Sequence, residues 1–197
     1  MDVLVDGLRD VRATLDGDAG GDCVVACPPH PRHGGSRHDE RLRAVSDALV
    51  DRGVDCLRID YGPWAQGEGE IDDASNAVEH CHRELGYDRV GLFGYSFGGA
   101  VALLAASETG PVVAVSVLAP SHRLSGELDA ASAAASLGVP TQVVCGARDT
   151  TVDWAPVADA VRDRGGDVVE LPADHFFVGQ AGRVAEAVAP FFVEAIG

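Results

Sequence analysis

The sequence contains no lysine, so all 15 of its basic residues are arginine. Acidic residues number 31, which gives a formal net charge of -16 at pH 7. Nucleic acids and anionic membrane surfaces bind positively charged faces, and a chain with this charge balance does not supply one. We therefore expect no nucleic-acid partner and no membrane partner. Because concentrated salt screens the repulsion among surface charges, the same composition favours a halophilic protein.

Long apolar runs are also absent. No window approaches the roughly 18 uninterrupted apolar residues of a membrane-spanning helix. The N-terminus, Met1 to Gly7, has neither a basic start nor a long apolar segment, which is unlike a secretory signal peptide. The five cysteines are odd in number and lie mostly inside apolar runs, at positions 23, 27, 56, 81 and 145. Buried, reduced thiols explain this pattern better than disulfides, so we expect a cytoplasmic protein.

Metal-ligand patterns are sparse. Cys23 and Cys27 have C-x3-C spacing, and Cys81 lies between His80 and His82. A zinc site needs a convergent set of about four ligands, and no second matching pair completes one. We therefore expect no metal site, and nothing in the sequence calls for an organic cofactor.

The sequence does contain a regular alternation of strand-like and helix-like segments after residue 20. Apolar runs predict strands at 23–27, 54–61, 90–93, 112–118, 141–145 and 168–171, preceded by two short ones at 3–5 and 11–15. Apolar residues at helical spacing predict helices at 39–52, 71–85, 99–108, 129–137, 155–164 and 184–196. This alternation predicts an α/β fold, a mostly parallel sheet with helices on both faces. Without a repeat or linker, we expect one domain, residues 1–197.

A G-x-S-x-G pattern, Gly94-Tyr95-Ser96-Phe97-Gly98, lies between a predicted strand and a predicted helix. The pattern alone recurs by chance in glycine-rich turns. A strand, a tight turn and a helix in this order, however, place Ser96 at the tip of the turn, where its hydroxyl is accessible as a nucleophile. The turn folds back so sharply that side chains at 94 and 98 would collide with backbone, which explains the glycines. The first N–H groups of the helix would stabilise an oxyanion.

Two more residues suited to nucleophilic catalysis follow predicted strands. Asp149 comes after the strand at 141–145, and His175 comes after the last strand. A serine hydroxyl needs a base to accept its proton, imidazole suits that role, and a carboxylate orients the imidazole. The order Ser96, Asp149, His175 is the one associated with α/β-hydrolases. Asp153, in the same loop as Asp149, is the alternative acid.

An oxyanion at Ser96 would need two backbone donors. One would be the N–H of Phe97, directly after the nucleophile. The other would come from the loop at 30–35, where proline at position 31 has no N–H, so Arg32 or His33 is the candidate.

The segment at 119–138, which follows the strand at 112–118, is too short for a substantial lid. We therefore expect an open site suited to small or exposed substrates. Side chains near the strand ends would line it and contact the substrate: His30, Trp64, His122 and Phe176.

Three of these motifs carry a family resemblance: Gly94-Tyr95-Ser96-Phe97-Gly98, His30-Pro31-Arg32-His33-Gly34-Gly35 and Ala173-Asp174-His175-Phe176-Phe177. Together they resemble the small, capless α/β-hydrolases related to the dienelactone hydrolases, over residues 22–193. The resemblance implies an α/β-hydrolase fold with Ser96, Asp149 and His175 as a catalytic triad. Position 96 is serine where dienelactone hydrolases proper have cysteine. The loop at 61–64 also lacks the Arg-Gly-x-Gly of the most similar group, so we expect a different pocket wall there.

These features predict a serine hydrolase that cleaves a small or exposed carboxylic ester or thioester through an acyl-enzyme intermediate. Two alternatives stay open. One is a non-catalytic scaffold that keeps the hydrolase fold to bind a partner, because one fold hosts many functions. The other is an acyltransferase or peptidase with the same triad, which would differ in the nucleophile that resolves the acyl-enzyme.

Overall fold

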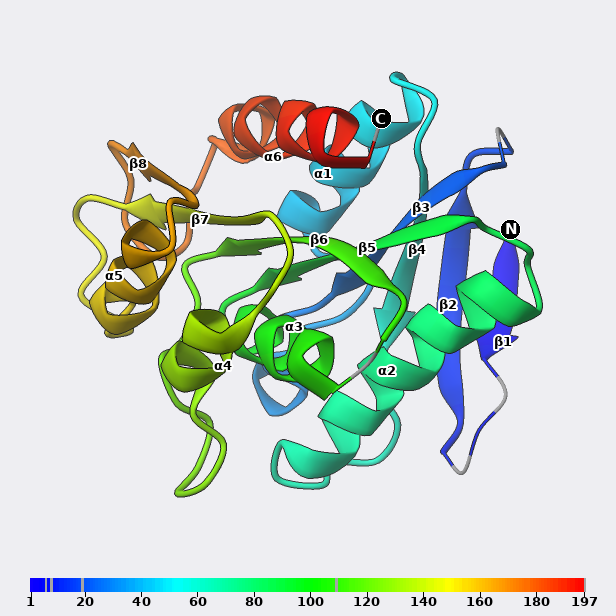
Figure 1. The fold of residues 1–197 in the computed structure, drawn as a ribbon, viewed down its shortest axis with the longest axis horizontal. Coiled ribbons are helices and arrows are strands. Elements are labelled where there is room, and N and C mark those ends of the chain that lie inside the picture. The colour runs from blue at the N-terminus through cyan, green and yellow to red at the C-terminus, as the bar shows by residue number, and fades with distance from the viewer. Residues whose placement is uncertain (6, 8, 19, 109, 197) are drawn as a thin grey trace.

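A twisted sheet runs through the middle of the molecule, and helices cover both of its faces (Figure 1). A computed structural model describes residues 1–5, 7, 9–18, 20–108 and 110–196. Within these residues the sheet has eight strands in the order β1-β2-β4-β3-β5-β6-β7-β8. The strands are β1 Asp2–Val5, β2 Val11–Asp16, β3 Asp22–Cys27, β4 Asp55–Asp60, β5 Arg89–Tyr95, β6 Val112–Leu118, β7 Thr141–Gly146 and β8 Asp167–Leu171. The α-helices are α1 Glu40–Val50, α2 Glu68–Arg83, α3 Phe97–Glu108, α4 Ala130–Ser136, α5 Ala155–Asp163 and α6 Ala181–Ile196.

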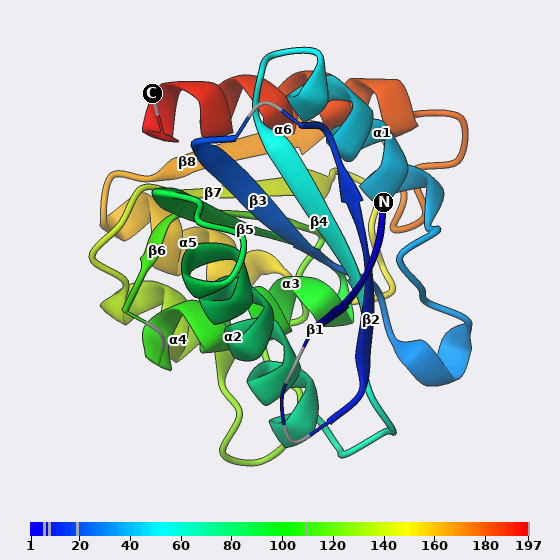
Figure 2. The same cartoon turned by 90° about the vertical axis from the view of Figure 1, so that its right-hand side faces the viewer.

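Strands β3 to β8 pair in parallel, whereas β1 and β2 form an antiparallel hairpin at one edge of the sheet (Figure 2). Each parallel connection crosses over through a helix, as such connections require. The mostly parallel sheet predicted from the sequence is therefore confirmed. In this arrangement the carboxyl ends of β3, β5, β6, β7 and β8 meet at one edge, where ligands bind in open α/β sheets.

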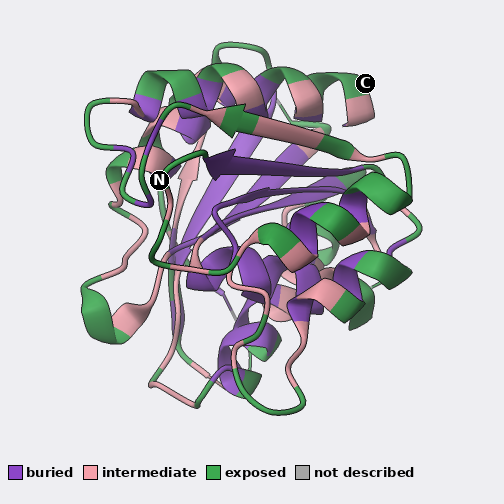
Figure 3. Cartoon of the chain, turned by 90° about the vertical axis from the view of Figure 1, so that its left-hand side faces the viewer, coloured by how far each residue is buried: buried purple, intermediate pink, exposed green. Residues whose placement is uncertain are grey.

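Two apolar layers hold the helices to the sheet. Helices α1 and α6 cover one face, and α2, α3, α4 and α5 cover the other (Figure 1). Adjacent residues of β5 serve different layers, because Leu92 packs towards α3 while Phe93 packs towards α6. The central strands are buried on both faces, whereas β8 at the far edge is only partly buried (Figure 3). This agrees with the nearly continuous apolar composition of β6, a pattern that predicts burial on both faces.

Three helices begin earlier than the sequence predicts, among them α3, which begins at Phe97 instead of residue 99. Helix α2 begins at Glu68 instead of residue 71, because the buried carboxylate of Glu70 accepts hydrogen bonds from the N–H groups of Ala65 (2.9 Å) and Gly67 (2.8 Å) and so caps the first turn. Helix α6 begins at Ala181 instead of residue 184. A short 3-10 helix, η1, at Pro31–His33 occupies what the sequence predicts as plain loop.

Residues 119–140, all of which are described, hold the seven-residue helix α4 and one isolated β-bridge. The expected absence of a substantial lid is thus a feature of the fold. All five cysteines are buried and none forms a disulfide. Burial raises the pKa of Cys27, Cys56 and Cys145 to about 12, so these thiols stay protonated at neutral pH. In the part of the chain that is described, every helix is too short or too polar to cross a membrane.

Candidate active site

Ser96 lies at the turn between β5 and α3, where the G-x-S-x-G pattern predicts it. Its φ angle is 56°, a left-handed conformation that costs a residue with a side chain roughly 1–3 kcal/mol. A Cβ added to Gly94 would lie 2.1 Å from the carbonyl oxygen of Gly98, and one added to Gly98 would lie 2.3 Å from that of Cys27. Backbone segments approach so closely here that only glycine fits at either position, which confirms the reason given from the sequence.

Backbone hydrogen bonds fix this turn, which we call the elbow (residues 94–98). The N–H of Ser96 donates to the carbonyl of Leu118 at the end of β6, at 2.8 Å. The carbonyl of Ser96 accepts from the N–H groups of Gly99 and Ala100, at 3.0 and 3.3 Å. The serine side chain is therefore held on a rigid backbone, and its Oγ lies 3.0 Å from Nε2 of His175.

His175 lies in the β8–α6 loop (residues 172–180), and its side chain is 6% exposed. Its Nδ1 lies 2.8 Å from Oδ2 of Asp149, whose side chain is fully buried. The other carboxylate oxygen accepts from the N–H groups of Thr151 (2.8 Å) and Val152 (3.3 Å). Because an ionised carboxylate only accepts, this arrangement requires the proton on Nδ1 and leaves Nε2 free to accept from the Ser96 hydroxyl.

The structure separates the two acids that the sequence left as alternatives. Asp153 is 63% exposed, and its carboxylate lies 4.0 Å from the ring of His122, not beside His175. Asp174 is also exposed and accepts from the N–H of Phe176. Asp149 is therefore the acid that contacts the imidazole next to Ser96.

The expected donors in the β3–α1 loop (residues 28–39) are already engaged. The N–H of Arg32 donates to Nδ1 of His30 at 3.2 Å, and the N–H of His33 donates to the His30 carbonyl at 2.9 Å, as the turn of η1 requires. Both N–H groups predicted as the second oxyanion donor, those of Arg32 and His33, are therefore occupied by bonds within the loop. Among the described residues, the N–H groups of His30 and Phe97 have no acceptor.

The sequence contains a signal for His30 as an N–H donor, although the spacing of the loop predicts Arg32 or His33. Positions 28 and 29 are both proline, so His30 carries the first N–H after β3. The end of β3 also lies against the elbow, because the Cys27 and Pro28 carbonyls occupy the space beside Gly98. The backbone of His30 thus follows directly from a segment in contact with the nucleophile turn.

A cavity of about 960 Å³ opens above Ser96 and His175. Three of the four predicted substrate-contacting residues line it, namely His30, Trp64 and Phe176. The fourth, His122, does not, because its Nδ1 lies 3.1 Å from the backbone carbonyl of Asp153 and its ring is directed to that loop. The residues on either side of it in sequence, with Leu124, line the cavity in its place: Ser121, Arg123 and Leu124.

Aromatic rings form one wall of the cavity around His30. Its ring centroid lies 4.6 Å from that of His33, 4.5 Å from that of Trp64 and 4.7 Å from that of Phe97. Burial, followed by the nearby His33 and Arg32, lowers the pKa of His30. A neutral ring is also what its Nδ1 needs in order to accept from the Arg32 N–H.

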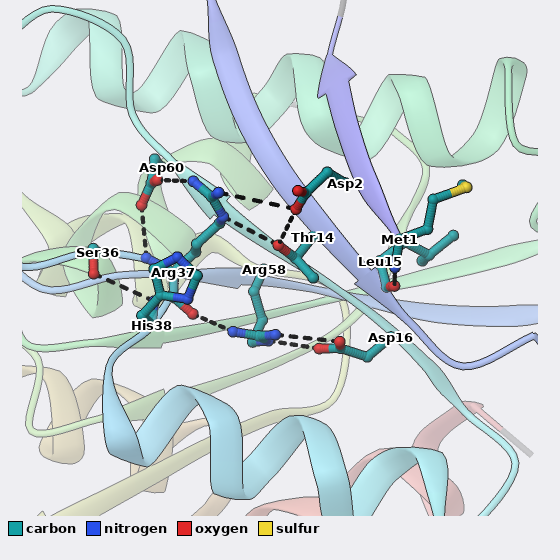
Figure 4. Close-up of polar contacts among 10 residues, drawn as sticks. All are labelled: Met1, Asp2, Thr14, Leu15, Asp16, Ser36, Arg37, His38, Arg58 and Asp60. Carbon is teal, nitrogen blue, oxygen red and sulfur yellow. Dashed lines mark hydrogen bonds and ion pairs between the residues drawn. The ribbon is translucent and has the colours of Figure 1, made fainter.

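Arg37 ties the β3–α1 loop to the sheet (Figure 4). Its N–H donates to Asp60 at 2.7 Å, its guanidinium pairs with the same carboxylate, and its Nε donates to Thr14 of β2 at 3.1 Å. The Arg37 carbonyl accepts from Arg58, whose Nε donates to Asp16 at 2.6 Å. Charged groups at the carboxyl end of β4 therefore hold this cavity wall in place.

The cavity does not share the acidity of the whole chain. Three arginines line it, Arg32, Arg41 and Arg123, against one acid, Asp39, which pairs with Arg41. No group of three or more His, Cys, Asp or Glu side chains among the described residues is arranged to hold a metal ion.

The chain is similar to a known protein family and to several solved structures. Residues 60–169, more than half of the chain, match the model of the dienelactone hydrolase family. The fold is similar to an α/β serine hydrolase homologue from Coxiella burnetii, with 24% identity over 96% of this chain and 96% of that one and a TM-score of 0.82. It is also similar to an α/β serine hydrolase without a lid from Xanthomonas campestris, with 24% identity over 98% and 94% of the two chains and a TM-score of 0.81.

An esterase from Pyrococcus furiosus has a TM-score of 0.85, with 17% identity over 100% of this chain and 91% of that one. At these identities the solved structures establish the fold alone. No curated protein sequence matches the chain. The family match is consistent with the lidless α/β-hydrolase fold and with the elbow at the carboxyl end of β5. This chain belongs to the dienelactone hydrolase family and is a hydrolase.

Proposed function

We propose that this hydrolase cleaves carboxylic esters or thioesters through an acyl-enzyme on Ser96, with His175 as general base and Asp149 as the acid that orients it. The observation that carries the proposal is the continuous chain of contacts from Ser96 Oγ to His175 Nε2 (3.0 Å) and from His175 Nδ1 to Asp149 Oδ2 (2.8 Å). These distances are within hydrogen-bond reach, as proton transfer requires.

Acylation begins when Ser96 Oγ attacks the carbonyl carbon while its proton moves to Nε2 of His175. The resulting tetrahedral intermediate carries an oxyanion. As it collapses, the bond from the carbon to the leaving oxygen or sulfur breaks, and the imidazolium returns the proton to that leaving group. Asp149 stabilises the imidazolium through Nδ1 in the meantime.

Deacylation repeats these steps with water. His175 takes a proton from the attacking water molecule, a second oxyanion forms, and the Ser96 oxygen leaves with the proton. The acid product is released and the free hydroxyl is restored.

The oxyanion would be stabilised by the N–H groups of Phe97 and His30. Neither has an acceptor among the described residues, and both residues line the cavity. Phe97 is the first residue of α3, so the positive end of the helix dipole lies at its N–H and adds to the stabilisation of the oxyanion. Because the N–H groups of Phe97 and His30 have no acceptor of their own, we favour them as donors over the occupied N–H groups of Arg32 and His33.

The substrate is a small or exposed ester. The lidless cavity of about 960 Å³ is open to solvent, and its aromatic wall of His30, Trp64 and Phe97 would contact the apolar part of the substrate. Without a lid, the enzyme has no device to shield a long lipid chain from water.

We further infer a cytoplasmic, high-salt setting. Five buried, unpaired thiols suit a reducing compartment. A net charge of -16 without any lysine is tolerated best where salt screens repulsion. The midpoint of thermal unfolding should therefore rise from dilute buffer to molar potassium chloride; a fall would contradict the inference.

The hydrolytic function is tested with 4-nitrophenyl acetate and an acetyl thioester, comparing the wild type with Ser96→Ala. We expect a burst of 4-nitrophenol followed by steady turnover, and a loss of kcat by more than about 1,000-fold in the variant. Turnover that survives in Ser96→Ala would contradict the serine mechanism. A folded wild-type protein that hydrolyses no ester or thioester would favour the binding scaffold instead.

A further inference from the structure

Two successive carbonyl groups next to the proposed base are held by side chains from distant parts of the chain. The hydroxyl of Tyr95 donates to the His175 carbonyl at 2.9 Å, and this bond is buried. The guanidinium of Arg41 donates through Nη1 to the Phe176 carbonyl at 3.0 Å. Tyr95 is the residue directly before Ser96, whereas Arg41 lies in the first turn of α1.

Arg41 is itself held in place. Its side chain pairs with Asp39 through two nitrogens, one of them at 2.9 Å, and Asp39 also caps α1 by accepting from the Arg41 N–H at 2.9 Å. The guanidinium carbon lies 4.8 Å from the centroid of the Tyr95 ring, a cation–π contact. The two donors are therefore one packed unit.

The β8–α6 loop needs such support around His175. Phe176 is 53% exposed, and Phe177 has a φ of 49°, which is unusual for a bulky residue. The bonds of the next residues stay inside the loop, from Phe176 N–H to Asp174 and from Gln180 N–H to the Phe177 carbonyl. Outside this loop, the N–H of Arg148 donates to the Ala173 carbonyl at 2.9 Å, two residues before the base. At His175 and Phe176 themselves, support from other elements comes from Tyr95 and Arg41 at the backbone and from Asp149 at the imidazole.

We propose that Tyr95 and Arg41 are positioning residues, which fix the backbone of His175 relative to Ser96. The hydroxyl of Tyr95 thereby determines the position of His175 relative to Ser96, the residue that follows Tyr95. Through Asp39, the same unit ties the base to the β3–α1 loop, which carries the second proposed oxyanion donor. The inference rests on the proposed function of Ser96 and His175.

The chemistry of Tyr95 suits a permanent donor. Burial raises the pKa of Tyr95 to about 12, so its hydroxyl keeps its proton throughout the neutral range. Misplacing a catalytic group by about 1 Å can cost about 100-fold in rate, so one bond at the base can matter for catalysis more than for folding.

The test compares Tyr95→Phe with Tyr87→Phe. Tyr87 is similarly buried and donates to Asp55 at 2.8 Å. It precedes the amino end of β5, whereas Ser96 follows the carboxyl end, and it is not part of the cavity lining, so both variants lose one buried hydroxyl bond but only one of them near the site. For Tyr95→Phe we expect the rate constant of Ser96 labelling by a fluorophosphonate, and kcat, to fall about 10-fold with KM within about twofold. For Tyr87→Phe we expect a lower unfolding midpoint and an unchanged labelling rate.

If Tyr95→Phe does not fold, a second pair of variants, at Arg41, provides the test. Arg41→Gln should lower kcat about 10-fold, and Arg41→Lys, which keeps the charge over the ring and a donor, should recover part of it. Wild-type labelling rates in Tyr95→Phe or Arg41→Gln would overturn the positioning role alone. The positioning role would also be overturned if Tyr95→Phe and Tyr87→Phe lost labelling rate equally, in proportion to the fall in their unfolding midpoints. A wild type that is not labelled at Ser96 would refute the proposed function, and the positioning role with it.

Discussion

The elbow and the β3–α1 loop face the same cavity, but different interactions hold them. In the elbow, backbone packs on backbone: Gly94 and Gly98 leave no space for a Cβ, and the backbone of Ser96 is bonded at both its N–H and its carbonyl. The loop is held by charged side chains: Arg37 pairs with Asp60 of β4, and Arg58 of β4, itself paired with Asp16 of β2, donates to the Arg37 carbonyl (Figure 4). The nucleophile is thus placed by steric fit, whereas the opposite wall is placed by ion pairs.

This difference has a physical consequence. Close packing is short-ranged and insensitive to salt, because a steric clash does not depend on charge. Ion pairs of partly exposed groups weaken as salt screens them and as acid protonates their carboxylates. The proposed nucleophile should therefore keep its geometry under conditions that loosen the wall carrying the proposed second oxyanion donor.

The largest effect should come from the elbow. In Gly98→Ala the new Cβ would meet the carbonyls of Cys27 and Pro28 at 2.3 Å, so a backbone must move and unfolding free energy should fall by about 3 kcal/mol or more. Activity should be lost. Gly182→Ala in α6 is the control, because nothing lies within 4 Å of its Cβ and alanine favours a helix. Thermal unfolding and ester turnover of both variants decide the matter, and a stable, active Gly98→Ala would remove the steric account.

The next largest effect on activity is expected from Asp149, compared with Asp153. Asp149→Asn should lower kcat by about 1,000- to 10,000-fold, because an amide no longer dictates which imidazole nitrogen carries the proton. Asp153→Asn, in the same loop but exposed and away from His175, should stay within about twofold. Steady-state kinetics with 4-nitrophenyl acetate compare them. If the two variants lost activity equally, the assignment of Asp149 would be untenable.

A smaller effect is expected from the loop. Arg37→Gln removes the guanidinium bonds to Asp60 and Thr14, and we expect a loss of about 1.5–3 kcal/mol in unfolding free energy and a few-fold loss in kcat. Arg43→Gln is the control, since Arg43 is exposed on α1 and forms no ion pair with the described residues. The stability difference between Arg37→Gln and the wild type should narrow in molar potassium chloride. A difference that widened would show that screening does not govern this wall.

The smallest effect should appear with pH. Burial alone would raise the pKa of Asp16, but the hydrogen bonds from Arg58 and Ser46 outweigh it, so its pKa lies below the ordinary value of 3.8. A lowered pKa contributes stability that is present above the unfolded value and is lost as pH falls through the folded one. The stability difference between wild type and Asp16→Asn, from urea unfolding, should thus be constant above about pH 5 and shrink below about pH 4. A constant difference down to pH 3 would contradict the ion-pair role.

The sequence alone predicted the parts of the molecule that depend on local pattern. The alternation of strands and helices, the elbow and the loops carrying Asp149 and His175 all follow from apolar spacing and from glycines that a tight turn requires. These features are local or are determined by the direction of parallel strands, so no knowledge of distant contacts is needed.

Features that depend on tertiary contacts were missed or left open. Helix α2 begins early because Glu70 caps it, and His122 is directed away from the cavity because the backbone of Asp153 lies beside it. Asp149 and Asp153 share one loop, so only the folded chain separates them. The tie between Tyr95 and the His175 carbonyl joins residues 80 positions apart, which no local pattern encodes.

The central claim is that Ser96 is an activated nucleophile, and covalent labelling tests it most directly. The wild type, Ser96→Ala and His175→Ala would be treated with a fluorophosphonate in molar potassium chloride, and the adduct located by mass spectrometry. The account predicts a stoichiometric adduct on Ser96 in the wild type, none in Ser96→Ala, and labelling slowed by about 1,000-fold or more in His175→Ala. Folded wild-type protein that carries no adduct, or carries it on another residue, would contradict the account.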